Sequence, residues 1–540
     1  MSKNIDLSKR FSNNQDIQPY PVIKKPKVRR FHQARWDEPI IFELSRPGQR
    51  GVLPPALEEG ITFNIGDVLS SLPVGMRRID PPKLPEVSQP QVLRHYDRLS
   101  QENLGTDLNI DIGQGTCTMK YSPKINDQLA RNTKVLGLHP LQDERTVQGI
   151  LEIIYRFELL LKEISGLDRF TLQPGAGSAA IYTNASIIRA YHASLGQLHT
   201  RNEIITTIFS HPSDAACAKT AGFKIITLYP GEDGYPDLEA LKAAVSERTA
   251  GLMITNPEDT GIFNPNIDQF VRIVHDAGGL CSYDQANANG ILGITRAGDV
   301  GFDLCHFNLH KTFSSPHGCG GPGVGATGVN KDLVRFLPVP LVEFDGIKYE
   351  LNYDLPDSIG KIRPFYGVAS VILRAYAWIM SLGADGLREV SEIAVLNNNY
   401  LLTKMLEIPG VSAPYAKGKR RIEQVRYSWK ELTDDTGVTS EQIGLRTADF
   451  GVHYWTSHHP FIVPEPCTLE PTESYSRDEL DEYINIMRKV AGEAYDNPEV
   501  VRSAPHNSTI HQINPLPFDN PNLWAMTWRA YQKKICKVSD

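Results

Sequence analysis

The sequence lacks several features that would place it in a specialised class of protein. Its seven cysteines are scattered and include no Cys-x-x-Cys pair, which argues against a disulfide framework or a zinc site and favours reduced thiols. No run of about 18 apolar residues occurs, so no membrane-spanning helix is expected. The N-terminal segment has no apolar core of the signal-peptide kind. These absences predict a soluble protein of the cytoplasm.

An excess of positive charge is also missing. The formal net charge is −7, whereas a nucleic-acid binder usually carries a basic face. The short basic run KKPKVRR at 24–30 lies in a polar segment and is interpreted as part of a solvated arm. What the chain does have is 41% hydrophobic and 22% charged residues, typical of a soluble globular protein. Its 540 residues predict two or more domains.

The pattern along the chain predicts three parts. Residues 1–126 are rich in proline and lack clear periodicity, which predicts an extended arm that wraps another body, such as a partner subunit. Residues 127–345 alternate short β-branched runs with amphipathic helices, which predicts an α/β domain with a mostly parallel sheet. Residues 346–540 are predicted to form a smaller α+β domain, in which Ser476 and Glu479 fit a capping box.

Two chargeable side chains follow buried strands of the predicted sheet. Asp284 ends the run GLCSYD, and Lys311 comes just after the run DLCHFN. Ligands of parallel sheets bind beyond the carboxyl ends of the strands, so this is where a site is expected. A desolvated lysine amine forms a Schiff base with an aldehyde, and an aspartate opposite a pyridine nitrogen keeps that nitrogen protonated. The pair therefore favours pyridoxal phosphate as cofactor.

A glycine-rich turn supplies the third element of such a site. Gly177 and Ser178 open a predicted helix, where backbone N–H groups can bind the phosphate of the cofactor. Each element also has a structural interpretation, since a loop lysine, a strand that ends in aspartate and a turn of this kind are all common. The three together, in this order, favour pyridoxal phosphate.

Three further residues are predicted to bind the cofactor. His211 follows a buried strand, where its imidazole either stacks on the cofactor ring or is a hydrogen-bonded structural residue. His310 is expected to be a neighbour of the cofactor and not a general base, and Ala286 lies two residues after Asp284. The predicted catalytic residues are Lys311, Asp284 and His211, and no metal ligand is predicted.

Many stretches also resemble the signatures of one family, in the same order and over nearly the whole chain. They include FELSRPGQRG, LRHYDRLSQEN, CTMKYSPKIN, NLHKTFSSPHGCGGPG, SIGKIRPFYG and LEPTES. The chain resembles the glycine dehydrogenase (decarboxylating) P-proteins of the glycine cleavage system, and within them the C-terminal half or the separate subunit 2. The resemblance implies the type I, aspartate-aminotransferase-like fold of pyridoxal phosphate enzymes. It also implies Lys311 as the Schiff-base lysine, Asp284 at the pyridine nitrogen and His211 over the ring.

The resemblance implies a reaction and partners as well. Glycine would displace Lys311 from the cofactor, lose its carboxylate as CO₂ and pass its aminomethyl group to the lipoyl arm of a small H carrier protein. In the two-subunit form, a homologous subunit 1 without the lysine helps to complete the site. A homo- or hetero-oligomer is therefore expected, and the extended N-terminal arm fits such an assembly.

Several segments depart from the family pattern. Ser178, Ala179, Ala180 and Ile181 stand where the family has Ala-His-Gly-Glu, and further departures lie at 112–117, 212–215, 421–425 and 453–456. A pocket that loses its polar groups usually loses its substrate, so these changes indicate an altered substrate or acceptor.

Three interpretations therefore stay open. The first, which we favour, is a glycine-cleavage subunit 2. The second is a repurposed enzyme of the same family, a decarboxylase, lyase or transferase of another amino acid. The third is a non-catalytic, pyridoxal phosphate-binding or regulatory subunit. The retained Lys311 and Asp284 argue against the third, because a structural subunit has no need of that pair.

Overall fold

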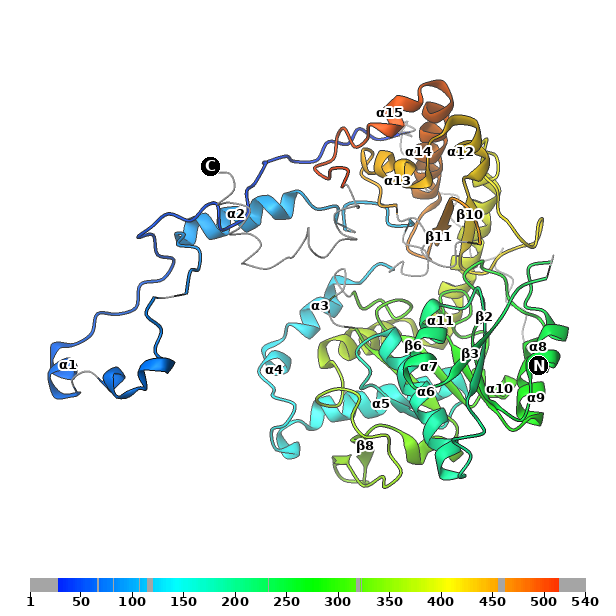
Figure 1. Ribbon diagram of the computed structural model, residues 1–540, viewed down its shortest axis with the longest axis horizontal. Helices are drawn as coiled ribbons and strands as arrows, with labels where there is room; N and C mark the ends of the chain where they lie inside the picture. Colours follow the sequence, from blue (N-terminus) through cyan, green and yellow to red (C-terminus); the bar gives the residue numbers. More distant parts are fainter. Residues whose placement is uncertain are drawn as a thin grey trace, which may run out of the picture.

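The computed structural model describes residues 28–65, 68–80, 82–105, 107–113, 120–231, 233–316, 321, 323–454 and 462–513. Two bodies lie one above the other, and the arm leaves them to one side (Figure 1). Among the described residues, no helix is long and apolar enough to cross a membrane.

The lower body is built on one seven-stranded sheet with the order β1-β7-β6-β5-β4-β2-β3. Only β7 runs against its neighbours, so the sheet is mostly parallel, as predicted. The strands are β1 Arg169–Thr171, β2 Glu203–Thr207, β3 Lys224–Leu228, β4 Thr249–Thr255, β5 Leu280–Asp284, β6 Leu304–Asn308 and β7 Gly325–Val329.

Helices cover both faces of this sheet, because successive strand residues point to opposite sides. On β5, Leu280 packs into one apolar cluster with residues of α6 and α7, whereas Cys281 and Tyr283 pack into the other with residues of α5 and α9. The helices of this body are α5 Gln148–Ser165, α6 Gly177–Ser194, α7 Pro212–Thr220, α8 Leu238–Ala244, α9 Ile267–Asp276 and α10 Ala297–Val300. Helix α5 is capped by Gly166, whose φ of 74° is left-handed.

A long helix connects the lower body to the upper one. Helix α11, Ala369–Met405, has a kink at Gly383; its first half packs on the sheet domain and its last turns join a second core. The hairpin of β8 Leu341–Phe344 and β9 Tyr349–Asn352 precedes it. The upper body holds the antiparallel pair β10 Val425–Ser428 and β11 Pro466–Leu469, with α12 Lys430–Thr436, α13 Ser440–Ala448, α14 Arg477–Asp496 and α15 Pro498–Arg502. The predicted capping box of Ser476 and Glu479 is confirmed at the start of α14.

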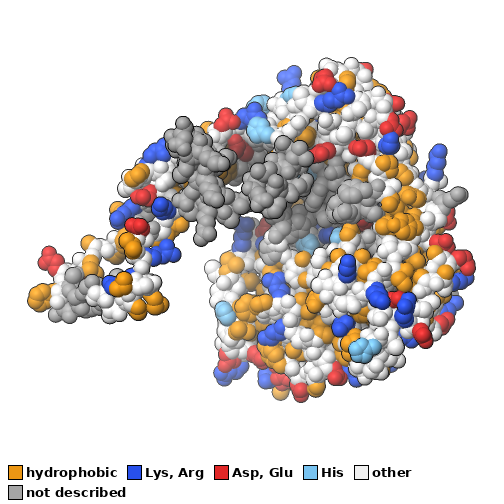
Figure 2. Space-filling view, viewed as in Figure 1, with side chains coloured by type: hydrophobic (Ala, Val, Ile, Leu, Met, Phe, Trp, Pro, Cys, Tyr) orange, Lys and Arg blue, Asp and Glu red, His pale blue; other side chains and the backbone are white. Residues whose placement is uncertain are grey.

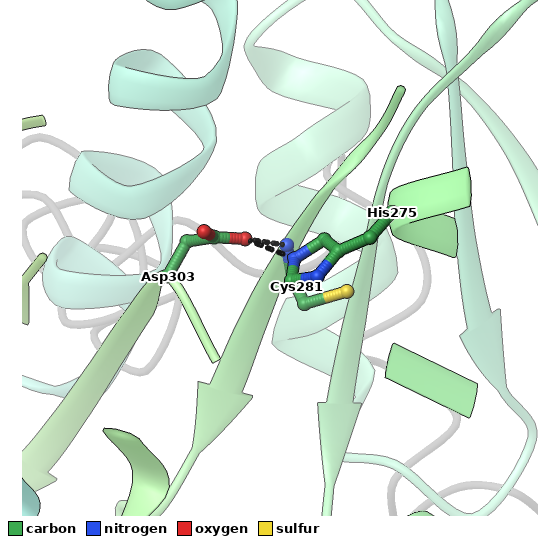
Figure 3. A group of neighbouring side chains, drawn as sticks. All are labelled: His275, Cys281 and Asp303. Atoms are coloured by element: carbon green, nitrogen blue, oxygen red, sulfur yellow. Dashed lines mark hydrogen bonds and ion pairs between the residues drawn. The ribbon is translucent and has the colours of Figure 1, made fainter. Parts of the chain in front are cut away.

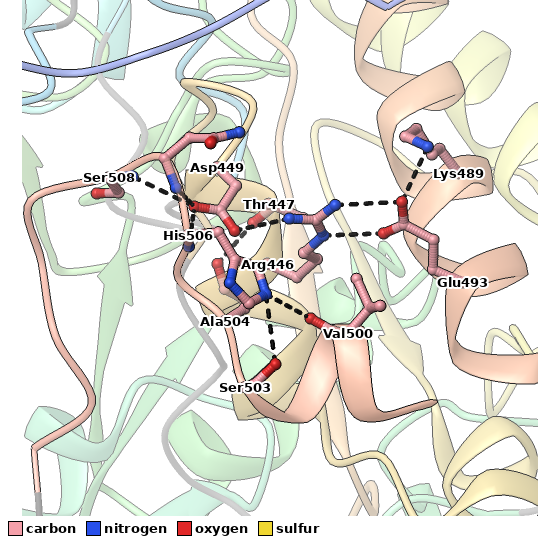
Figure 4. Close-up of polar contacts among 12 residues, drawn as sticks. Arg446, Thr447, Asp449, Lys489, Glu493, Val500, Ser503, Ala504, His506 and Ser508 are labelled. Carbon is pink, nitrogen blue, oxygen red and sulfur yellow. Dashed lines mark hydrogen bonds and ion pairs between the residues drawn. The ribbon is translucent and has the colours of Figure 1, made fainter. Parts of the chain in front are cut away.

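Arg446 of α13 is the centre of a polar network that fastens the upper body (Figure 4). It binds Glu493 of α14 through two nitrogens, at 2.8 and 3.2 Å, and Asp449 at 2.8 Å. Asp449 in turn accepts hydrogen bonds from the backbone N–H groups of His506 and Ser508. One buried cation therefore joins two helices and the segment that follows α15.

The N-terminal part runs as an extended arm away from both bodies (Figure 1). It carries α1 Glu59–Ile65 and α2 Gln89–Gln101, followed by α3 Lys124–Ala130 and α4 Thr133–Leu136 beside the sheet domain. Hydrophobic side chains are spread over its surface (Figure 2), and Val52, Leu53 and Ile79 are 77, 72 and 99% exposed. The arm is fastened at its root, where Gln33 donates its N–H to the carbonyl of Asn507 at 2.9 Å.

Candidate active site

Asp284 and Lys311 lie at the same edge of the sheet, as their strands predict. Asp284 is the last residue of β5, and Lys311 comes three residues after the end of the adjacent parallel strand β6. Both are buried, with 3 and 6% of their surface exposed. The carboxyl ends of β5 and β6 thus bring a carboxylate and an amine to one place.

Asp284 is held by its own loop and by the neighbouring strand. Its Oδ1 accepts the N–H of Ala286 at 2.8 Å, and Nε2 of His306 lies 3.2 Å from the same oxygen. His306 is the residue directly opposite Asp284 in the pairing of β5 with β6. Burial alone would raise the pKa of this carboxyl, but the nearby His306 and His211, the N–H of Ala286 and the amine of Lys311 together outweigh burial and lower it. Asp284 is therefore the ionised member of the site.

A second carboxyl, Asp214 of α7, lies beside Asp284. Burial, and then the negative charge of Asp284, raise the pKa of Asp214 well above its ordinary value. The hydroxyl of Thr255, at the end of β4, donates to Asp214 Oδ2 at 3.2 Å. Because two adjacent carboxyls do not both ionise in a buried site, Asp214 keeps the proton and Asp284 carries the charge.

Two helices begin at this edge of the sheet. Helix α6 starts at Gly177 and α7 starts after His211, and the hydroxyls of Ser178 and Ser213 in their first turns lie 3.0 Å apart. A Cβ on Gly177 would lie 2.6 Å from Nδ2 of Asn308, so only glycine lets α6 start so close to β6. The exposed N–H groups and the dipole of a helix start favour an anion there.

The other predicted cofactor residues lie around the same edge. His211 accepts the N–H of Ser213 on Nδ1 at 3.1 Å, as the N-cap of α7. Ala286 fixes Asp284 through its N–H, and its carbonyl accepts the N–H of Asn308. His310 is buried and packs closely against Gly323. A Cβ on Gly323 would lie 2.7 Å from Nδ1 of His310. The stacking of His211 on a ring and the cofactor contacts of Ala286 and His310 stay predictions.

The segments that depart from the family pattern fall partly in the described chain. Ser178 is exposed beside Ser213, whereas Ala180 and Ile181 are buried, Ile181 in the apolar cluster under α6. At Ala180 and Ile181, the residues that differ from the family pattern therefore belong to the buried face of α6. Of 112–117, residues 114–117 lie outside the described residues, and so do residues 455 and 456 of 453–456.

The upper body packs onto the loop that follows β4, at the carboxyl edge of the sheet. Arg426 of β10 donates from Nη2 to Oδ2 of Asp259 at 3.0 Å, and both side chains are buried. Gly261 has φ 75° and approaches so closely that a Cβ would overlap the carbonyl of Gln424. A buried ion pair with this geometry fixes the position of one body on the other.

Several carboxyls are buried at this contact. Burial raises the pKa of Glu258 to about 8, although the hydroxyl of Thr207 donates to it. Burial, and then the charge of Glu470, raise the pKa of Glu423 well above its ordinary value. Sequence reasoning did not single out Glu258, Glu423 or Asp214, because nothing in their local pattern distinguishes them from ordinary loop or helix residues. It also passed over His306, although a polar residue inside a buried strand is itself a signal.

Lys120 is a second buried lysine. Its Nζ lies 3.0 Å from Oε2 of Glu473 and 4.8 Å from the centre of the Trp378 ring. Lys120 thus has an anion and an aromatic face as partners, in the way of a structural lysine.

At the opposite edge, a nitrogen, a sulfur and an oxygen of His275, Cys281 and Asp303 lie within 4.8 Å of one another (Figure 3). Oδ2 of Asp303 accepts hydrogen bonds from Nε2 of His275 and from the N–H of Cys281, both at 2.8 Å. Oδ1 accepts from Asn330 at 2.8 Å, and burial raises the pKa of the Cys281 thiol. This cluster is held together by its own hydrogen bonds.

Comparison with known proteins identifies the family of the chain. The model of class-V aminotransferases matches residues 180–341, and the model of the glycine dehydrogenase C-terminal domain matches residues 390–512. The probable glycine dehydrogenase (decarboxylating) subunit 2 of Pyrococcus abyssi is 48% identical over 506 residues, which cover 93% of this chain and 98% of the relative. The chain belongs to the glycine dehydrogenase (decarboxylating) subunit 2 family. The predicted family is thereby confirmed.

Other members of the subunit 2 family are similar over almost their whole length. The probable subunit 2 of Staphylothermus marinus is 40% identical over 94% of this chain and 99% of its own, and that of Halalkalibacterium halodurans is 43% identical over 88 and 96%. A crystal structure of inhibitor-bound glycine decarboxylase (P-protein) of the glycine cleavage system matches with a TM-score of 0.68 at 20% identity. The match covers 81% of this chain and 100% of that one. The predicted type I fold is confirmed by these matches.

Proposed function

We propose that this chain is the cofactor-bearing subunit 2 of a glycine-decarboxylating enzyme of the glycine cleavage system. The observation that carries the proposal is the position of Asp284 and Lys311 at the ends of two adjacent parallel strands, in front of the first turn of α6. The relatives, which are named as probable glycine dehydrogenase (decarboxylating) subunits 2, support the same reaction.

The donor set fits pyridoxal phosphate. The amine of Lys311 would hold the aldehyde carbon, and the carboxylate of Asp284 would keep a proton on the ring nitrogen. The N–H groups at the start of α6 would bind the phosphate, since no side chain at Gly177 blocks them. When bound, the cofactor supplies an electron sink for the electron pair left when glycine loses CO₂.

Neighbouring residues keep Asp284 ionised, orient it and hold the two bodies together around the site. Asp214 holds its proton and so prevents a second negative charge beside Asp284. His306 contacts Asp284 from the neighbouring strand and fixes its orientation. The contact of Arg426 with Asp259 holds the upper body against the sheet domain.

The proposal includes partners and a location. The relatives are called subunit 2, a name that implies a subunit 1, and we propose that a homologous subunit 1 completes the site in a hetero-oligomer. The lipoyl arm of a small carrier protein would take the aminomethyl group. The enzyme would work in the cytoplasm.

The test is exchange of labelled bicarbonate into the carboxyl group of glycine. It uses the purified chain with pyridoxal phosphate, subunit 1 from the same genome and a lipoylated carrier. We expect exchange that falls roughly 10³-fold or more in both Lys311→Ala and Lys311→Arg, because arginine keeps the charge but cannot bond the cofactor. Lys120→Met is the matched control for the loss of a buried lysine, and it should retain the cofactor absorbance band.

A wild-type protein that shows the band of the lysine-bound cofactor but no exchange would overturn the proposal. Exchange or CO₂ release with a different amino acid in that protein would support a repurposed enzyme of the same family. A protein that never acquires the band would support a non-catalytic subunit.

A further inference from the structure

Arg363 lies on the turn that leads into α6. A Cβ on Gly175 would overlap Nη1 of Arg363 and lie 3.2 Å from its Cζ, so the partly buried guanidinium packs directly on this glycine. Gly175 does not have a left-handed φ, so space for the guanidinium, and not backbone conformation, requires glycine here. Within the described chain, the side chain of Arg363 forms no hydrogen bond and no ion pair. A cation is thus held beside the start of α6 without an anion.

Asn308 faces the same helix start from the sheet. It is the last residue of β6, three residues before Lys311, and only 4% of its surface is exposed. A Cβ on Gly177 would lie 2.6 Å from Nδ2 of Asn308, so the amide points at the first residue of α6. Oδ1 of the same amide is buried and has no hydrogen-bond partner among the residues that the structure describes. Buried amides are nearly always hydrogen-bonded in folded proteins, so this one indicates a ligand at the start of α6.

The same turn also contacts the segment of Lys311. A Cβ on Gly323 would lie 2.7 Å from Nδ1 of His310, the residue before Lys311, and 3.2 Å from the carbonyl oxygen of Gly175. Contacts therefore run from Arg363 through Gly175 and Gly323 to the residue next to Lys311. The cation and the lysine belong to one site.

Three sets of donors meet at this turn. They are the planar fork of the Arg363 guanidinium, the amide of Asn308 and the backbone N–H groups of the first turn of α6, a helix of 18 residues. A phosphate group has three acceptor oxygens and can use all three sets, whereas a carboxylate has two. The donor set therefore favours a phosphate.

We propose that Arg363 and Asn308 clamp the phosphate group of the cofactor at the start of α6, one from the outside of the turn and one from the sheet. The inference rests on the proposed function only in taking pyridoxal phosphate as the cofactor. It goes beyond that function because it gives the phosphate two side-chain partners, one of them a cation that offsets its charge.

The first experiment compares pyridoxal phosphate with pyridoxal, which has the same aldehyde but no phosphate. Each is titrated into the full-length chain freed of cofactor, with subunit 1 present, and the absorbance band of the lysine-bound form gives its Kd. Lys311→Ala corrects for reaction with other lysines. In Arg363→Met we expect the Kd of pyridoxal phosphate to rise roughly 10- to 100-fold, because charge-assisted hydrogen bonds are lost. The Kd of pyridoxal should stay within about twofold of wild type, since it lacks the group that is clamped.

Three further variants sharpen this comparison. Asn308→Ala should raise the Kd of pyridoxal phosphate by a smaller factor, roughly 3- to 10-fold, because its amide is uncharged. Arg363→Lys keeps the charge but not the fork and should recover part of the affinity. Arg374→Met is the matched control: Arg374 is also partly buried, but its Nε donates to Asp127 at 2.7 Å, and its loss should leave both Kd values in place.

Gly175→Ala gives an independent test in case Arg363→Met does not fold. The added methyl group displaces the guanidinium, so the affinity for pyridoxal phosphate should fall here as well. In the double variant Gly175→Ala/Arg363→Met the two losses should not add, because both act through one contact.

Equal losses of affinity for pyridoxal phosphate and pyridoxal in Arg363→Met, or no loss for either, would overturn the inference. A raised KM for glycine at an unchanged Kd for pyridoxal phosphate would also overturn it, since Arg363 would then bind the substrate carboxylate. A selective loss for pyridoxal phosphate in a protein that fails the bicarbonate exchange would support the inference and overturn only the proposed reaction. A wild-type chain that forms no band with either aldehyde would overturn both.

Discussion

The two edges of the central sheet differ in how fully their buried carboxyl groups are hydrogen-bonded. At the amino ends of the strands, Asp303 uses both oxygens, one for His275 and the N–H of Cys281 and the other for Asn330. At the carboxyl ends, Asp284 lies beside the protonated Asp214, and neither ring nitrogen of His306 makes a well-aligned hydrogen bond within the described chain. The first edge is a closed network that stabilises the fold, and the second leaves polar groups available for chemistry.

The comparison also explains why the lower body needs the upper one. The carboxyl ends of the strands bring several carboxyls together, and the upper body covers them with Arg426 on Asp259 and with Glu470 on Asn287 and Asn289. The amino ends are stabilised within the sheet domain itself. The same sheet therefore has one self-sufficient edge and one that is completed by another part of the chain.

Among the changes that test this comparison, the largest effect is expected for Asp284→Asn at the carboxyl edge. The amide oxygen still accepts the N–H of Ala286, but the side chain cannot carry the charge that would hold a proton on the cofactor ring. Exchange of bicarbonate into glycine should fall roughly a hundred- to a thousandfold, while the urea midpoint of unfolding changes little. Nearly full activity in Asp284→Asn would show that the charge of Asp284 has no role in the reaction.

The matched change at the amino edge is Asp303→Asn. The new amide group places N–H donors against the donors of Cys281 and His275, so the free energy of unfolding should fall by about 2–3 kcal/mol. Urea denaturation measures the loss. Below the unfolding transition, the exchange activity should stay within about twofold of wild type, since no predicted cofactor residue is touched. A large loss of activity without loss of stability would break the comparison.

The most gradual effect concerns the pH dependence of stability. The pKa of Glu258 is about 8 in the folded protein and near 4.5 in the unfolded chain, so the folded state binds one more proton between these values. Stability contributed by this proton is complete below pH 4.5 and is lost as the pH rises through 8, with a slope of about 1.4 kcal/mol per pH unit.

Glu258→Gln should therefore flatten the fall of stability between pH 5 and 8, and it should unfold at a higher temperature than wild type at pH 8.5. Thermal unfolding followed by circular dichroism over this range measures the slope. Glu499→Gln changes an exposed carboxyl, 73% of whose side chain is accessible, and is the control. A wild-type slope in Glu258→Gln would show that this carboxyl does not carry the effect.

The sequence predicts the parts of the site that follow from local pattern. Alternating buried strands and helices indicate a mostly parallel sheet, and the ends of two such strands place Asp284 and Lys311 at one edge. The start of a helix after a glycine-rich turn places Gly177 there as well. These inferences need only the direction of the strands, which the sequence pattern carries.

The rest of the site depends on contacts between segments far apart in the chain. Asp214 lies on a helix start and Glu470 after a strand of the other body. No local feature indicates that Asp214 lies beside Asp284, or that Glu470 accepts hydrogen bonds from Asn287 and Asn289. His306 is different, because a polar residue inside a buried strand is itself a signal. The register of β5 with β6 places His306 opposite Asp284, and this register follows from the three-dimensional structure and not from the pattern of either strand.

The fastening of the arm has a consequence for synthesis on the ribosome. In the described part of the chain, Gln33 is bound by Asn507 and Ser508, Glu102 by Thr509, and Asp111 by Tyr475. The anchors of this segment are thus made roughly 400 residues after it, which at 5–20 residues per second is a wait of roughly 20–80 s. Throughout that time the apolar side chains of the arm are free to meet other proteins, so the arm is fixed in place only after the upper body has been made.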